Sequence, residues 1–267
     1  MKKFLCLVLC LLLLSGCANT PSYRNDGEIN FPTFPQPTET QAPTQTEPTT
    51  EPEPTAPPAP EHSPFYIPGI PVEDVILYFG EVCLDAEFSE SGDATLVQKW
   101  DIPICYTIHG DTTEEDLTTL NKFTSWLNTI EGFPGIYEAD DPVHANLNIY
   151  FCTKDELIDT LGDNFYGTDA GVIFWYEDNA IYDATICYRT DLDQHLRNSV
   201  ILEEIYNGLG PVQDTNLRPD SIIYSAFSEP QSLTPVDELI LKLLYHPDIL
   251  CGMNAEECEA VIRELYY

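Results

Sequence analysis

The chain has 267 residues and carries 45 Asp and Glu against 11 Lys and Arg, so its formal net charge at pH 7 is −34. A surface with this excess of negative charge repels phosphates, which excludes nucleic acid and anionic lipid as charge-matched partners. The length allows one or two folded domains.

The first 17 residues have the order of parts that is typical of an exported protein. Met1–Lys3 is positively charged, and Phe4–Leu14 is an apolar run of about 11 residues, too short for a bilayer core of ~30 Å. Leu14-Ser15-Gly16-Cys17 then resembles the lipobox of bacterial lipoproteins. The resemblance implies that residues 1–16 are a signal peptide and that a lipid on Cys17 anchors the protein to the outer face of a membrane. The alternative is a plain signal peptide followed by an unrelated cysteine.

Residues 17–63 are rich in Pro, Thr and Glu, as in Glu51-Pro52-Glu53-Pro54-Thr55. Such a composition buries too little apolar surface to offset the entropy lost on folding. We therefore expect a disordered linker, followed by one folded domain over residues 64–267.

The predicted domain contains six cysteines, an even number that permits three disulfide bonds in an exported protein. No two of them have the C-x-x-C spacing of zinc ribbons and redox motifs, and Cys251 and Cys258 form the most plausible local pair. Buried free thiols are the alternative, so the disulfide pattern stays open, as does the oligomeric state. The six cysteines are Cys83, Cys105, Cys152, Cys187, Cys251 and Cys258.

The first half of the domain alternates between helix and strand patterns. Residues 71–88 predict a helix, and residues 96–108 predict a strand in which Pro103 requires an edge position or a bulge. Thr112–Glu115 predicts a capping box, and the apolar stripe after it predicts a long amphipathic helix that ends at Gly132.

The next stretch predicts three further elements. Asn146–Cys152 alternates between apolar and polar residues and predicts a strand, which a capped short helix follows as far as Gly162. Two β-rich runs, Gly171–Glu177 and Ala180–Tyr188, flank Asp178-Asn179, which is a typical hairpin turn.

Helices dominate the remainder of the chain. Residues 192–208 predict one helix, and capping residues at Thr234 and Asn254 predict two more. Taken with the strands, this order predicts an α+β fold in which a small mixed sheet is backed by long helices.

The helix over residues 192–208 carries the candidate site. Glu203 and Asn207 are four residues apart, so both side chains leave the same face of the helix. Gly210 then offers a left-handed stop that turns the chain sharply, and Gln213 follows at a distance that lets it fold back toward that face.

Several stretches of the second half resemble a bacterial family described as domain of unknown function 2927. Glu203–Asn207 is similar to that family's E-E-L-x-Q, and Leu209–Asp214 is similar to its L-G-P-x-N-D. Leu244–Asp248 and Gly252-Met253 are similar to its L-Y-D-P-x and G-M-T. The resemblance covers residues 201–257 well and the rest of the domain weakly.

That family is itself similar to the metzincin zinc peptidases, whose motif is H-E-x-x-H-x-x-G-x-x-H/D. The resemblance places Glu203, Asn207 and Gln213 at the three metal-ligand positions and Glu204 at the position of the general base. It implies a zincin-type fold in which the strand near residues 171–177 lies along a cleft above the helix.

Two further stretches extend the metzincin resemblance. Ser221–Tyr224 stands where metzincins have S-x-M-Y, the methionine turn under the metal, and Ile223 replaces the Met. Leu233–Asp237 is similar to the start of their last helix. The resemblance implies that the scaffold is kept even where the metal ligands are not.

The residue types at the ligand positions do not favour zinc, which prefers Cys sulfur and His nitrogen and accepts a carboxylate. Asn207 and Gln213 offer neutral amide oxygens, which suit hard cations, so we expect no metal and no other cofactor. Glu203, Asn207 and Gln213 are then expected to form a hydrogen-bonded clasp between helix and turn. The alternative is metal-independent acid–base catalysis by Glu204, in a cleft shared with Glu203 and Asp214.

These observations leave three functions open. The first is a surface lipoprotein whose degenerate metzincin-like domain binds peptide or glycan through Glu203, Asn207, Gln213 and Asp214, without zinc-dependent cleavage. The second is a hydrolase that uses Glu204 without a metal, and the third is a purely structural envelope protein. We favour the first, and we expect the membrane anchor at Cys17 and no nucleic-acid partner.

Overall fold

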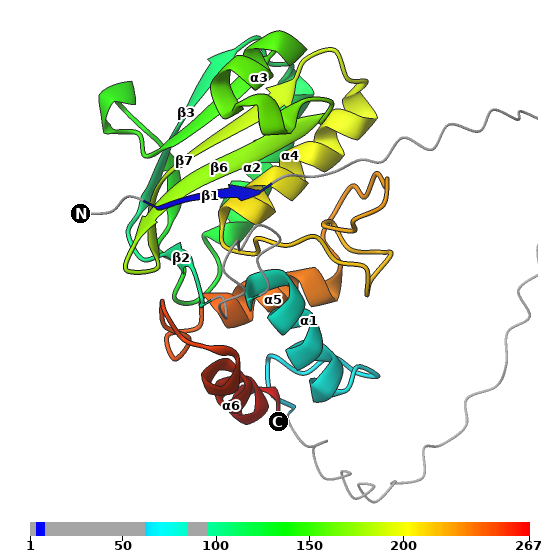
Figure 1. The fold of residues 1–267 in the computed structure, drawn as a ribbon. Coiled ribbons are helices and arrows are strands. Elements are labelled where there is room, and N and C mark those ends of the chain that lie inside the picture. The colour runs from blue at the N-terminus through cyan, green and yellow to red at the C-terminus, as the bar shows by residue number, and fades with distance from the viewer. Residues whose placement is uncertain (1–3, 9–61, 85–95) are drawn as a thin grey trace, which may run out of the picture. The chain divides into compact units, whose positions relative to one another are not determined.

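The computed structural model describes residues 4–8, 62–84 and 96–267 (Figure 1). The predicted lipidation at Cys17 and nearly all of the predicted linker over residues 17–63 lie outside the described residues. Helices and strands are mixed along the chain, which confirms the α+β class. No helix among the described residues is long and apolar enough to cross a bilayer.

A mixed seven-stranded sheet forms the centre of the fold. The neighbours β7, β5, β3 and β4 run parallel to one another, and β6 and β1 are added with antiparallel pairing at one side. The short strand β2 pairs in parallel with the start of β7. Across the sheet the strands are β1 (Phe4–Val8), β6 (Ala170–Glu177), β7 (Ala180–Arg189), β5 (Leu147–Cys152), β3 (Ile104–Gly110) and β4 (Ile136–Glu138), with β2 at Lys99–Trp100.

Helices cover both faces of the sheet. One face carries α4, which packs on β6 and β7 and is itself contacted by α2, whereas α3 packs on the same two strands from the opposite face. The helices α1, α5 and α6 gather beyond the end of the sheet, where α1 contacts both of the others (Figure 1). The helices are α1 (Val72–Leu84), α2 (Glu114–Leu127), α3 (Lys154–Leu161), α4 (Gln194–Gly208), α5 (Pro235–Leu244) and α6 (Ala255–Tyr266), with short 3-10 turns η1 (Pro142–His144) and η2 (Asp163–Phe165).

Alternation along β6 and β7 explains why both faces of the sheet are covered. Val172 and Ile186 face α4, where a Cβ atom added to Gly208 would lie 3.3 Å from Val172 Cγ2 and 3.7 Å from Ile186 Cδ1. Ile173 and Cys187, one position further along each strand, belong to the separate apolar cluster under α3. Successive strand residues point to opposite faces, so these nearly continuous apolar runs require cover on both sides.

Most of the local predictions are confirmed. Asp178 and Asn179 have φ values of 51° and 66°, which the two central residues of a type I′ hairpin turn require. Capping boxes begin α3 at Thr153, α5 at Thr234 and α6 at Asn254. Local hydrogen-bonding patterns therefore set these boundaries as the sequence predicts.

Besides the end of α2, which lies at Leu127 and not at the predicted Gly132, two element boundaries differ from the prediction. The single strand predicted over residues 96–108 is divided into β2 and β3, because Pro103 has no N–H for the ladder, and Ile102 in the break is 40% exposed. The capping box of α2 is made by Thr113 and Asp116, one residue later than predicted. Because the capping box is shifted by one residue, the acidic residue that is buried at the start of α2 is Asp116, whereas Glu115 is exposed.

Candidate functional site

The last turns of α4 carry Glu203, Glu204 and Asn207 over β6 and β7. Their burial differs: Asn207 is fully buried and Glu204 is 1% exposed, whereas Glu203 is half-buried. Glu203 is therefore the one of the three predicted site residues whose side chain reaches solvent.

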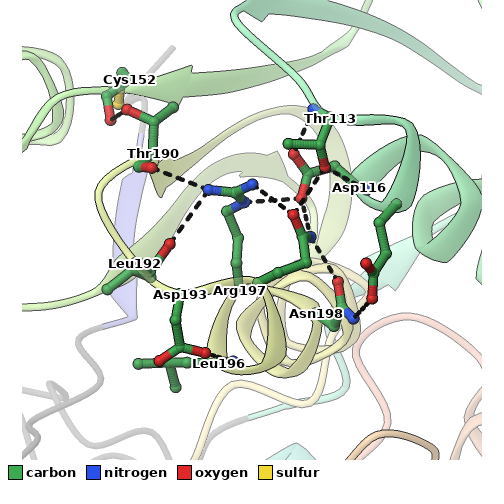
Figure 2. Close-up of polar contacts among 11 residues, drawn as sticks. Thr113, Asp116, Cys152, Thr190, Leu192, Asp193, Leu196, Arg197 and Asn198 are labelled. Atoms are coloured by element: carbon green, nitrogen blue, oxygen red, sulfur yellow. Dashed lines mark hydrogen bonds and ion pairs between the residues drawn. The ribbon is translucent and has the colours of Figure 1, made fainter.

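A buried ion pair fixes the start of α4 against α2 (Figure 2). Arg197 Nε donates to Asp116 Oδ1 at 2.8 Å, and both side chains are almost completely buried. Gln194 Nε2 donates to the same oxygen at 2.7 Å, and Thr113 N donates to Asp116 Oδ2 at 2.8 Å. The guanidinium also donates to the carbonyl oxygen of Thr190 at 3.0 Å. Both carboxylate oxygens of Asp116 therefore accept hydrogen bonds. A buried charge is tolerated only when its polar atoms are paired in this way.

The network changes the acidity of Asp116. Burial by itself raises the pKa of this carboxyl, but the hydrogen bonds from Arg197, Thr113 and Gln194 outweigh burial and hold the pKa below its usual value. Sequence reasoning missed this network, because the capping box that signals it does not reveal a partner about 80 residues away.

The chain turns sharply after α4 at Gly210, as the sequence predicts. Its φ value is 127°, and a Cβ atom at this position would lie 2.3 Å from the carbonyl oxygen of Gln98, so only glycine fits. Val212 N and Gln213 N both donate to Val82 O on α1, at 2.8 and 3.3 Å. Backbone hydrogen bonds to α1 therefore hold the turn.

The clasp predicted from Glu203, Asn207 and Gln213 is not formed through Gln213. The Gln213 Oε1 atom is buried and accepts no hydrogen bond within the described part of the chain, so it does not receive a donor from Asn207. Asp214, the next residue, is half-buried. Main-chain bonds to α1 hold the turn, and the binding role of Glu203, Asn207, Gln213 and Asp214 stays a prediction.

A second turn, Ser221–Tyr224, is tied to the start of α5 by the buried carboxylate of Asp237. Ser221 Oγ donates to Asp237 Oδ1 at 2.8 Å, and Tyr78 OH on α1 donates to the same oxygen at 2.9 Å. The capping residue Thr234 donates to Asp237 Oδ2 from Oγ1 at 2.8 Å and from N at 2.9 Å. One carboxylate therefore caps α5 and joins α1, α5 and the turn.

The two turns lie side by side. Thr215 and Tyr224 form a parallel bridge, in which Thr215 N donates to Ile223 O at 2.8 Å and Ser225 N donates to Thr215 O at 2.9 Å. Thr215 Oγ1 also donates to Glu81 on α1. The end of α4, both turns, α1 and α5 are therefore linked by hydrogen bonds into one unit.

Glu204 lies on the side of α4 that faces the sheet. Burial raises the pKa of Tyr188 on β7 well above its ordinary value, and the nearby negative charge of Glu204 raises it further. Tyr188 OH donates to Ile201 O on α4 at 3.1 Å. A general acid or base must contact the group that it serves, and because Glu204 is 1% exposed its catalytic role stays a prediction.

The residues do not fit a zinc site. Among residues 62–84 and 96–267, no group of three or more His, Cys, Asp or Glu side chains is arranged to hold a metal ion. The positions considered for ligands offer one carboxylate, Glu203, and the amides of Asn207 and Gln213, a donor set that zinc does not prefer.

All six cysteines of the described domain are free thiols. Cys251 and Cys258, the expected local pair, are not bonded to each other. Cys152 on β5 and Cys187 on β7 lie in hydrogen-bond contact, which lowers the pKa of Cys152 and raises that of Cys187. The free thiols correspond to the alternative that the sequence left open.

The family model described as "Protein of unknown function (DUF2927)" matches residues 73–264. The chain belongs to this family. The match begins in α1 and ends in α6, so the DUF2927 region contains both turns, α4 and every strand of the sheet except β1. A search of curated proteins finds no match.

Proposed function

We propose that the mature protein is a lipid-anchored surface protein whose DUF2927 domain binds an extended peptide along the outer edge of β6. The observation that carries this proposal is the position of β6 in the sheet. One side of β6 pairs with β7, and the other side pairs with residues 4–8 in antiparallel register, from Phe4 opposite Tyr176 to Val8 opposite Val172.

The predicted signal peptide, residues 1–16, includes all of β1. Its removal would leave the outer edge of β6 without that strand, which lies along β6 in Figure 1. An unpaired edge presents N–H and C=O groups to which an extended chain can add as a further strand. Because the available groups are those of a backbone ladder, the proposal favours a peptide over a glycan.

The flanks of β6 supply side chains that would discriminate among peptides. A strand added to β6 would direct alternate side chains to opposite faces of the sheet. On one face lie α4, with half-buried Glu203, and the ring of Tyr176. On the other face lie α3 and the half-buried ring of Trp175. Glu203 therefore keeps a binding role in the proposal, while buried Glu204 does not.

The test uses a soluble chain that begins at residue 18 and lacks both β1 and Cys17, and a synthetic peptide with the sequence of residues 2–9. We expect saturable binding, with new protection from hydrogen exchange at the amides of residues 170–177. Two peptides N-methylated at alternate positions provide the matched control, because only one set of amides in a strand faces its neighbour. One methylated peptide should lose binding and the other should keep it. Equal binding by both, or protection elsewhere in the domain, would refute the edge-strand proposal.

We also propose that the domain has the zincin arrangement without its metal. Three features support this: an antiparallel edge strand beside α4, the glycine turn at Gly210, and the Ser221–Tyr224 turn held by Asp237. The variant with Glu203→His, Asn207→His and Gln213→His should bind zinc if the backbone keeps that geometry. The single Glu203→His variant controls for loose binding to the acidic surface. A folded triple variant that binds zinc no better than the single variant would contradict the arrangement.

A further inference from the structure

Two cysteine thiols meet under α3, on the face of the sheet that α4 does not cover. Cys152 is the last residue of β5 and Cys187 lies in β7. The thiol of Cys187 donates a hydrogen bond to the sulfur of Cys152. Both residues belong to the separate apolar cluster under α3. The pair is therefore a buried dithiol that none of the interactions described above uses.

The register of the sheet limits how closely the two residues can approach. Cys187 is paired with Tyr150 and Cys152 with Arg189, so the cysteines are offset by two positions on neighbouring parallel strands. A strand spacing of about 4.8 Å and a rise of about 3.3 Å per residue place their Cα atoms about 8 Å apart. Disulfide bonds join Cα atoms that are about 4.4–6.8 Å apart. A direct S–S bond would therefore require movement of the backbone.

A metal ion between the two sulfur atoms fits this offset better than a disulfide bond does. Metal–thiolate bonds are about 2.3 Å long, so a linear ion holds its two sulfur atoms roughly 4.6 Å apart. The sulfur atoms of a disulfide are only about 2.05 Å apart. Two thiols in hydrogen-bond contact need only a small separation to admit such an ion.

The number and type of ligands select the metal. Zinc sites take four ligands, and no third His, Cys, Asp or Glu side chain within residues 62–84 and 96–267 completes a metal-binding group with this pair. Soft thiolate ligands select Cu(I), and Cu(I), unlike zinc, accepts two ligands in a line. The dithiol therefore suits Cu(I).

The surroundings also suit a buried dithiolate complex. Cys187 is 0% exposed, whereas Cys152 is 8% exposed and lies close enough to the surface to receive an ion. Cys152 directly precedes Thr153, the N-cap of α3. The start of a helix carries a partial positive charge, which favours the net negative charge of a Cu(I) ion with two thiolates.

We propose that Cys152 and Cys187 bind one Cu(I) ion as a linear dithiolate. Two Cu–S bonds replace the two S–H bonds, two protons pass to the solvent, and copper stays monovalent. The site lies on β5 and β7, so it is distinct from the proposed peptide edge on β6.

The test is an anaerobic titration with Cu(I) of the soluble chain that begins at residue 18. Bicinchoninate, a chelator whose Cu(I) complex is coloured, competes for the metal. We expect the protein to withdraw one equivalent of Cu(I), and X-ray absorption at the copper edge should show two sulfur neighbours only. A protein that leaves the coloured complex unchanged, or bound copper with nitrogen or oxygen neighbours, would overturn the assignment.

Variants assign the binding to the two thiols. Loss of an outer-shell partner already lowers metal affinity about 10- to 100-fold, so Cys152→Ser and Cys187→Ala should each lower the Cu(I) affinity at least about hundredfold. Cys251→Ser removes a half-buried thiol elsewhere and should leave the affinity unchanged. Urea unfolding establishes that each variant is folded. A loss in Cys251→Ser as large as that in Cys152→Ser would place the copper elsewhere.

Oxidised glutathione tests the disulfide alternative on the unmodified chain, without any substitution. In that reaction the two thiols would be oxidised to one disulfide, and oxidised glutathione would be reduced to two thiols. Because of the register, we expect mass spectrometry to find Cys152 and Cys187 unlinked in the folded domain. A disulfide between them in a domain that keeps its fold would overturn the geometric argument for a bridging ion.

Discussion

At the residue scale, two buried carboxylates connect parts of the chain that are far apart in sequence. Asp116 and Asp237 are each the third residue of a helix and complete a capping box with Thr113 and Thr234. Each also accepts from a distant donor, Arg197 in the first case and Tyr78 in the second. A carboxylate is tolerated at zero exposure because both of its oxygens are supplied with donors.

Removal of the Asp237 carboxylate should therefore be costly. Asp237→Ala removes the acceptor that Tyr78, Ser221 and half-buried Thr234 share, and only Tyr78 and Ser221 can still bond each other, so we expect a loss of about 3 kcal/mol in the free energy of unfolding. Urea denaturation measures this loss. The neighbouring change Glu238→Ala breaks a partly exposed i, i+4 pair with Lys242 and should cost less than about 0.5 kcal/mol. Similar values for the two variants would contradict the proposed role of Asp237.

The lowered pKa of Asp116 predicts a loss of stability in acid. Because the folded-state pKa lies below the unfolded value of about 3.9, the stabilisation is complete above that value and is lost as the pH falls through the folded-state pKa. Asp116→Asn should be less stable at neutral pH, but its free energy of unfolding should fall less between about pH 5 and about pH 2. Urea unfolding at each pH provides the comparison.

A control for this measurement is Glu114→Gln, an exposed change on the same first turn of α2 that leaves the Asp116–Arg197 pair intact. Its pH dependence should match that of the unmodified protein. If Asp116→Asn has the same acid slope as this control, the buried pair does not contribute to the pH dependence.

At the element scale, the fold depends on how α4 is fixed at its two ends. The start is held by the Arg197–Asp116 pair, and the end is held by the turn at Gly210, whose backbone approaches Gln98 closely. Tyr245 OH, from the C-cap residue of α5, also donates to the carbonyl oxygen of Leu209, the C-cap of α4, at 2.7 Å. These contacts place Glu203 beside β6 without any bond from Gln213.

Substitution of two glycines by alanine should change the free energy of unfolding in opposite directions. Gly210→Ala places a Cβ atom 2.3 Å from Gln98 O at a φ value of 127°, so we expect a loss of at least about 2 kcal/mol of stability. Gly80→Ala lies inside α1 with no atom within 4 Å of the new Cβ, so we expect a gain of about 0.5–1 kcal/mol. Thermal and urea unfolding of both variants measure the difference. A neutral Gly210→Ala variant would mean that the turn can relax.

At the scale of the whole molecule, a strongly acidic domain is combined with a lipoprotein-like N-terminus. All four arginines of the described residues are in ion pairs with carboxylates: Arg189, Arg197, Arg218 and Arg263. Little positive charge is left to attract anionic lipid headgroups. Attachment to a membrane would therefore have to come from the predicted lipid at Cys17.

The anchor is tested by fractionation and intact-mass measurement. Cys17→Ser should move the protein from the membrane fraction to the medium, or leave an uncleaved precursor, because the lipidated thiol is lost. Cys10→Ser, within the apolar run of the signal peptide, keeps the lipobox and should leave the protein in the membrane fraction. An unchanged mass and an unchanged location for Cys17→Ser would exclude the lipid anchor.

Features that depend on near neighbours in the chain could be predicted from the amino-acid sequence. The hairpin at Asp178-Asn179, the caps at Thr153, Thr234 and Asn254, and the glycine stop at Gly210 follow from φ preferences and from hydrogen bonds that span a few residues. Motif spacing in the second half also identified the family, which the match over residues 73–264 confirms.

Which distant groups meet, and which of them are buried, could be seen only in the folded molecule. Glu203 and Glu204 are adjacent residues of the same type, yet packing buries Glu204 and leaves Glu203 half-buried. Likewise, nothing in the local sequence indicates that Val82 on α1 would hold the turn in place of Gln213. Local patterns report the conformation of a few consecutive residues, whereas burial and long-range partners depend on how separate elements pack, and that information is spread over the whole chain.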